Sequence, residues 1–244
     1  MFSLFTKLSC WYKPCHQVKE SIFTAAIIWN NHPFTLMNHS LANDWQSAQA
    51  DVFWNDIARF DHVLQLYEND VIFIDTLIGF VESTIRANQI AIVIATNSHL
   101  TALEAQLENH GHTIEKLIAD HIFIPVSAED TLDEVFVDDS VDENRFMQVL
   151  SNFLDHAKHN QKKVRVFGEM VALLWAQGNK DAALQLEHVA NRISKQEAFI
   201  RYCAYPKELF TADGSDKSVC DCHSKIISGS EQQLDTVTYR DSLR

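Results

Sequence analysis

The sequence predicts an α/β fold of three layers, in which helices cover both faces of a mostly parallel, doubly wound sheet. Short apolar runs rich in β-branched residues alternate along the chain with stretches that have apolar residues at helical spacing. Strict alternation of strand and helix is typical of a parallel sheet with right-handed crossovers. The 244 residues are 46% hydrophobic and 22% charged, so the chain is long enough for one substantial core or two small ones.

The first strand is expected at residues 62–67, where apolar side chains alternate with polar ones. A helix over residues 71–87 follows, with Asp70 as its expected N-cap. Asn88 comes after this helix, where a left-handed residue is common and Asn is the best choice after Gly.

Residues 90–96 are a nearly continuous apolar run, which predicts a central strand covered on both faces. Asn97 or Ser98 is expected to cap the next helix, which ends at Gly111.

A third strand is expected at residues 121–126, and Ser127 with Asp130 resembles a capping box at the start of a helix. Residues 138–142 are a polar break, and residues 145–159 form an amphipathic helix in this prediction. The break contains no Gly, which leaves its turn geometry open.

The next strand begins at Val164 and turns at Gly168 directly into an apolar helix. A second helix is expected at residues 179–194 and a last clear strand at residues 199–204. Residues 1–50 lack this regular pattern and are expected to be a partly disordered extension or short helices. Periodicity is lost again after residue 228, which predicts a flexible tail over residues 229–244.

The N-terminal region superficially resembles a signal peptide, because lysines precede the apolar run at residues 22–29. The run is short, no small-residue cleavage site follows it, and it cannot cross a bilayer. Met37 is an alternative start. We therefore expect a cytoplasmic protein without a membrane partner.

The formal charge of −13 and the pI near 5.3 disfavour binding to nucleic acid or to an anionic membrane. The five cysteines are an odd number scattered along the chain, which fits a reducing compartment better than a disulfide framework.

Glu169 lies where a strand is expected to end and a helix to begin. In an open α/β sheet this rim is the usual place for ligands, because the strand ends leave a crevice there. The alternative is that Glu169 only caps its own helix. Both interpretations remain open at the level of the sequence.

The turn after the first strand, residues 67–70, reads Tyr-Glu-Asn-Asp. A phosphate loop needs glycines there, followed by Lys and Ser or Thr, and two carboxylates would repel a triphosphate. ATP hydrolysis of the usual kind is therefore excluded, while nucleotide binding in another pose stays open.

No metal site and no cofactor are expected. Cys220, Cys222 and His223 form the densest cluster of metal-ligand residue types, but no partner pair follows at a metal-binding spacing. No Gly-x-Ser-x-Gly or His-Glu-x-x-His motif is present.

Several segments resemble one family when taken in this order: HVLQLYE at residues 62–68, IVIAT at 92–96, VRVFGEMVALLW at 164–175, ALQLE at 183–187, CAYP at 203–206 and CHS at 222–224. They resemble the MEDS domain, the sensory domain named after methanogens, methylotrophs and the DcmR regulator. The resemblance assigns residues 51–228 to a MEDS-like domain. It implies a fold similar to the RecA and KaiC ATPases with a degenerate P-loop.

The resemblance implies a non-catalytic sensory module that binds a small molecule at the carboxyl edge of the sheet. Relatives are often fused to histidine kinase or DNA-binding segments; here the partner is expected to be a separate histidine kinase or regulator, or a second copy of the chain. The alternatives are an enzyme with Glu169 as general base, paired with His223 or His62, a degenerate nucleotide-binding protein, and a purely structural partner-binding protein. The expected ligand-binding residues are His62, Tyr67, Glu68, Thr96, Glu169, Trp175 and His223.

Overall fold

The computed structural model describes Trp54 and residues 57–58, 61–138, 140–159, 161–210, 215–230 and 233–239. The extension predicted over residues 1–50 lies outside the described residues.

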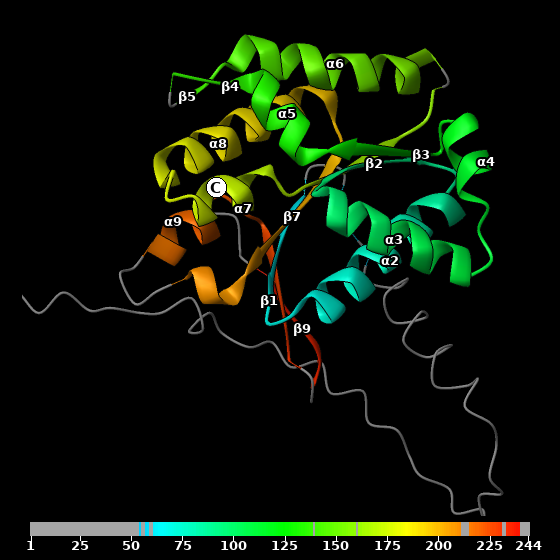
Figure 1. Cartoon of the computed structure of the whole chain (residues 1–244), viewed down its shortest axis with the longest axis horizontal. Helices are drawn as coiled ribbons and strands as arrows, with labels where there is room; N and C mark the ends of the chain where they lie inside the picture. Colours follow the sequence, from blue (N-terminus) through cyan, green and yellow to red (C-terminus); the bar gives the residue numbers. More distant parts are fainter. Residues whose placement is uncertain are drawn as a thin grey trace, which may run out of the picture.

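The centre of the fold is a sheet with the strand order β3-β2-β6-β7-β1-β8-β9 (Figure 1). All neighbouring strands from β3 to β8 are parallel, and β9 joins the edge antiparallel to β8. The strands are β1 (His62–Tyr67), β2 (Ile90–Ala95), β3 (Phe123–Ser127), β6 (Val164–Gly168), β7 (Ile200–Pro206), β8 (Lys225–Ser230) and β9 (Gln233–Tyr239); β4 (Phe136–Val137) and β5 (Ser140–Val141) form a separate hairpin.

Helices cover both faces of this sheet, which confirms the predicted three-layer α/β class (Figure 1). One layer consists of α2 (Asp70–Arg86), α3 (Asn97–Asn109) and α4 (Ile114–Ala119). The other contains α5 (Ala128–Val135), α6 (Glu143–His159), α7 (Met170–Ala176), α8 (Lys180–Glu197) and α9 (Ser215–Asp221), and the short 3-10 helix Lys207–Leu209 follows β7.

Successive side chains of a strand point to opposite faces of the sheet and so contribute to two separate cores. Leu64 and Leu66 of β1 pack with α5–α9, whereas Val63 and Tyr67 pack with α2–α4. All six residues of β2 are buried, because this strand has neighbours on both sides and helices on both faces. The prediction of a central strand here is confirmed.

The helix caps correct two expectations. Asn69, rather than Asp70, caps α2, because its side-chain oxygen accepts a hydrogen bond from Ile72 N at 3.1 Å. Thr96, rather than Asn97 or Ser98, caps α3 and accepts from His99 N at 3.3 Å. In both cases the helix begins one or two residues earlier than expected, directly after the capping residue.

Other local predictions are confirmed. Ser127 caps α5 by accepting from Asp130 N at 3.1 Å. Asn88 has the left-handed φ of 53° expected after α2. In the polar break, Asp138 adopts a φ of 50°, so an Asp takes the conformation for which Gly would be favoured.

The C-terminal part adds structure that the sequence did not predict. β8 extends the parallel sheet beside β1, and β9 lies within residues 229–244, where the loss of periodicity had predicted a tail. No helix among the described residues is long and apolar enough to cross a membrane.

The chain changes sides of the sheet between β2 and β6. β2 continues into α3 on one face, and the neighbouring β6 continues into α7 on the other. Such a switch point leaves room at the carboxyl ends of the two strands, which is where ligands bind in open α/β sheets.

Candidate functional site

The residues predicted to form one site separate into two groups in the structure. Thr96 and Glu169 meet at the carboxyl ends of β2 and β6. His62 and His223 are buried together elsewhere, at the start of β1 and after α9, with ring centroids 3.7 Å apart. The prediction that His223 belongs to the carboxyl-edge site is therefore wrong, because the segment after α9 packs against the first residue of β1.

Glu169 ties the ends of the two strands together. Its side chain does not cap α7; Oε2 instead accepts a hydrogen bond from Thr96 N at 2.9 Å, and Oε1 lies 2.7 Å from His99 Nδ1. Glu169 N also donates to Ile94 O at 2.9 Å. With the residue only 4% exposed, both carboxylate oxygens are used within the protein.

His99 is a part of this edge that the sequence analysis missed. Burial lowers the pKa of His99, but the hydrogen bond and charge of Glu169, with Asp70 and Glu129 nearby, outweigh it and raise this pKa above its usual value. The imidazole also makes an edge contact with Phe73, with ring centroids 4.8 Å apart. The sequence feature that could have identified His99 is its position in the first turn of the helix that follows a strand.

Of the other predicted ligand residues, Tyr67 lies near Glu169, whereas Glu68 and Trp175 interact with other parts of the described chain. Tyr67 is buried and stacks on Phe73, and burial together with the charge of Glu169 raises its pKa. Glu68 is exposed, and its carboxylate lies 2.8 Å from Lys207 Nζ. Trp175 lies on α7, where its Nε1 donates to Leu209 O at 3.4 Å and its ring packs against Tyr205, so it belongs to the packed core.

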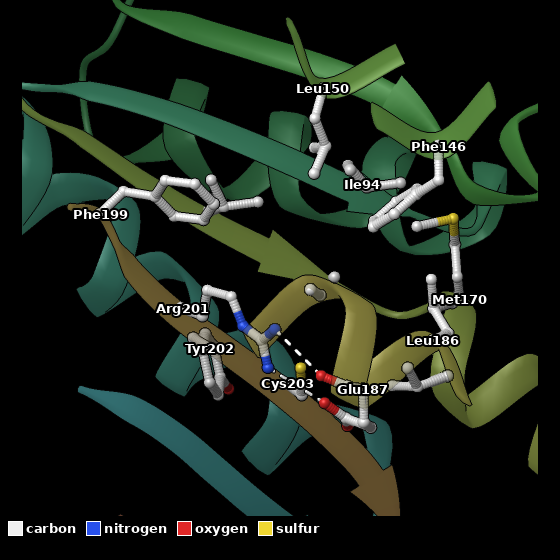
Figure 2. Close-up of a pocket in the computed structure, with 14 residues that line it drawn as sticks. Ile94, Phe146, Leu150, Met170, Leu186, Glu187, Phe199, Arg201, Tyr202 and Cys203 are labelled. Atoms are coloured by element: carbon white, nitrogen blue, oxygen red, sulfur yellow. Dashed lines mark hydrogen bonds and ion pairs between the residues drawn. The ribbon is translucent and has the colours of Figure 1, made fainter. Parts of the chain in front are cut away.

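A cavity of about 40 Å³ lies between the sheet and helices α6–α8. Figure 2 shows apolar side chains around it and the Glu187–Arg201 ion pair, with Cys203 beside it, at one end. Gly168 and Met170, the neighbours of Glu169 in the chain, line the cavity as well. The apolar walls are Ile94, Phe146, Leu150, Val166, Val171, Leu186, Ala190 and Phe199.

A buried polar cluster adjoins this end of the cavity; it consists of His62, Glu187, Arg201, Cys203 and His223. Arg201 Nη2 lies 3.1 Å from Glu187 Oε2 and also 2.6 Å from each ring nitrogen of His62. Every member is at least nine-tenths buried. The cluster joins His62 and His223, which were predicted as ligand-binding residues, with Glu187, Arg201 and Cys203, which were not.

Burial dominates the protonation states in this cluster. Burial lowers the pKa of His62 well below its usual value, and the charge of Arg201 adds to the effect. Burial and the neighbouring carboxylate of Glu187 raise the pKa of Cys203 well above its usual value. His62 is therefore a neutral imidazole and Cys203 a thiol at neutral pH unless a further cation is bound.

The comparison with protein-family models agrees with the sequence resemblance. A family model described as "MEDS: MEthanogen/methylotroph, DcmR Sensory domain" matches residues 61–224. No curated protein matches the chain. A protein of Pyrococcus horikoshii OT3, solved in a structural study, is similar with a TM-score of 0.49 and 10% sequence identity, over 80% of this chain and 93% of that chain.

Proposed function

This chain belongs to the MEDS family of sensory domains, and on that premise we propose that it is a non-catalytic sensory module whose small-molecule ligand enters the cavity beside the β6–α7 junction. The observation that carries the proposal is the position of this cavity. It lies under the carboxyl ends of β2 and β6, where the chain switches between the faces of the sheet.

The lining of the cavity indicates the chemistry of the ligand. Its walls are almost entirely aliphatic and aromatic, and Glu187 and Arg201 are the charged residues among them. A space of about 40 Å³ accommodates only a few non-hydrogen atoms. A short hydrocarbon derivative with one polar group fits both the size and the polarity.

The junction next to the cavity offers a route for the signal. Gly168 and Met170 line the cavity, and Glu169 between them is bonded to Thr96 and His99 at the start of α3. A ligand that displaces the start of α7 strains these contacts and so alters the opposite helical layer. The receiving partner in this proposal is a separate histidine kinase or regulator, or a second copy of the chain.

The enzymatic alternative has less support. A general base must reach its substrate, whereas both oxygens of Glu169 accept bonds from the protein itself. Its imidazole partner is His99, not His62 or His223 as expected for an enzyme. The turn after β1 carries Glu68 and Asp70 at an acidic edge, which opposes a triphosphate as well.

A cavity-filling variant tests the proposal. Short alcohols, ketones and halogenated hydrocarbons are screened by thermal shift on the full chain, and a true ligand raises the melting temperature with concentration. Ala190→Leu is expected to abolish that shift, because the added side chain fills the cavity. Ala102→Leu is the matched control, since Ala102 is a half-buried helical alanine in the opposite layer.

The control variant is expected to keep the wild-type shift. A shift that survives in Ala190→Leu places the ligand elsewhere and contradicts the proposal. A shift produced instead by nucleotide with Mg²⁺ favours the degenerate nucleotide-binding protein.

A further inference from the structure

The polar cluster next to the cavity contains, besides Arg201, four side chains of the types that bind metal ions. One ligand atom from each of His62, Glu187, Cys203 and His223 lies within 4.8 Å of all the others. These residues come from β1, α8, β7 and the segment after α9, so the fold assembles them from four separate places. All are buried, and none belongs to a local metal-binding motif.

Hydrogen bonds fix both imidazoles in the orientation that metal ligands adopt. His62 Nδ1 lies 3.1 Å from Cys222 O, and His223 Nδ1 lies 2.7 Å from Val219 O. A carbonyl oxygen can only accept, so Nδ1 of His223 carries the proton and Nε2 carries the lone pair. For His62 the Cys222 carbonyl favours the same tautomer, whereas Arg201 Nη2, a donor 2.6 Å from Nδ1, opposes it until Arg201 is displaced. Metal-bound histidines are typically held in this way by a backbone carbonyl on the far nitrogen.

The two Nε2 atoms face the same carboxylate. His62 Nε2 lies 3.5 Å from Glu187 Oε2, and His223 Nε2 lies 3.5 Å from Glu187 Oε1. A lone pair that faces a carboxylate oxygen is favourable only when a proton or a cation lies between them. Beside His62 that cation is the Arg201 guanidinium, whose Nη2 lies 2.6 Å from His62 Nε2 and 3.1 Å from Glu187 Oε2. Cys203 Sγ, 3.1 Å from His62 Nε2, adds a further electron-rich atom to this centre.

We propose that His62, Glu187, Cys203 and His223 bind a transition-metal ion, with Zn²⁺ the best match to the donor set. Two imidazoles, a thiolate and a carboxylate are borderline to soft ligands, which select Zn²⁺ over Mg²⁺ or Ca²⁺. A tetrahedral Zn²⁺ holds its ligand atoms roughly 3–4 Å apart. The separations of 3.1 and 3.5 Å already lie in that range.

Tyr205 and Arg201 hold the Glu187 carboxylate in position. Tyr205 Oη donates to Glu187 Oε1 at 3.0 Å, and Arg201 Nη2 donates to Glu187 Oε2 at 3.1 Å. Arg201 also competes with the ion, because its Nη2 lies 2.6 Å from His62 Nε2. Binding therefore displaces Arg201 from the imidazole, and the Cys203 thiol releases its proton to solvent as the sulfur becomes a ligand.

The test measures the metal directly and is independent of the small-molecule proposal. Full-length protein is stripped with chelator, incubated with Zn²⁺, desalted and analysed for bound metal. About one equivalent is expected to remain. Cys203→Ser is expected to weaken binding at least about ten-fold. Cys222→Ser is the matched control, because the Cys222 thiol lies outside the four-residue group and donates to Ser218 O.

A spectroscopic measurement on the unaltered protein covers the case in which Cys203→Ser fails to fold. Co²⁺ loading is expected to give a thiolate charge-transfer band, and X-ray absorption of the Zn²⁺ form is expected to show one sulfur among nitrogen and oxygen neighbours. No retained metal, a shell without sulfur, or a shell of several sulfurs overturns the proposal. The ligand screen at the cavity would be unaffected by that outcome.

Discussion

Replacing Glu187 by alanine is expected to destabilise the protein by about 3–5 kcal/mol, because it removes one partner of a buried ion pair. Glu187 is fully buried and Arg201 is 4% exposed. Without the carboxylate, the guanidinium keeps its charge in a site that water does not reach, and Tyr205 loses its hydrogen-bond acceptor.

Chemical denaturation in the presence of chelator measures this effect without any contribution from metal binding. The matched control is the double variant Glu187→Leu with Arg201→Met, which removes both charges and keeps most of the volume. It is expected to recover a large part of the stability, since an apolar replacement of a whole ion pair is often neutral. A loss below about 1 kcal/mol for Glu187→Ala would mean that water screens the cluster as it does a surface pair.

Replacing Glu169 by alanine is expected to cost about 2–4 kcal/mol at pH 6, because two hydrogen bonds that involve a charged group are lost at a buried strand end. The carboxylate holds Thr96 N at 2.9 Å and His99 Nδ1 at 2.7 Å. This loss is expected to depend on the pH.

The direction of this pH dependence follows from His99, whose pKa in the folded state is raised above its value in the unfolded chain. Its contribution to stability is fully present below about pH 6.5 and is lost as the pH rises through the raised pKa. The difference in unfolding free energy between wild type and Glu169→Ala is therefore expected to shrink from pH 6 to pH 9. Denaturation curves at several pH values measure it, and a constant or growing difference would show that the imidazole takes no part. Glu169→Gln is expected to keep the shape of the side chain and to remove the pH dependence of stability that comes from the Glu169–His99 pair.

Much of the fold could be predicted because its signals are local. The apolar run at residues 90–95 has the pattern of a strand buried on both faces, and it is the strand β2. Ser127 and Asp130 predicted a cap that the structure contains. Asp70 was predicted to cap α2, but its neighbour Asn69 does so. Both residue types serve as N-caps, and which of the two does so depends on where the helix begins.

The sites were harder to predict, because their members are far apart in the chain. Glu169 could be selected from its position between a strand and a helix, and the structure places it at a switch point of the sheet. The polar cluster joins residues 62, 187, 201, 203 and 223, and nothing in the spacing of those residues predicts that they meet. The spacing in the chain groups His223 with Cys222, whereas the structure stacks His223 on His62.

The central claim is that a small molecule binds in the cavity between the sheet and helices α6–α8. Methyl NMR of the full chain, titrated with the short hydrocarbon derivative that gives the largest thermal shift, tests it most directly. The methyl signals of Ile94, Leu150, Met170 and Leu186 are expected to move together with one affinity, because all four side chains line the cavity. Signals of Leu103 in the opposite layer serve as the reference. Changes confined to other methyl groups, or no change at saturating ligand, would contradict the account.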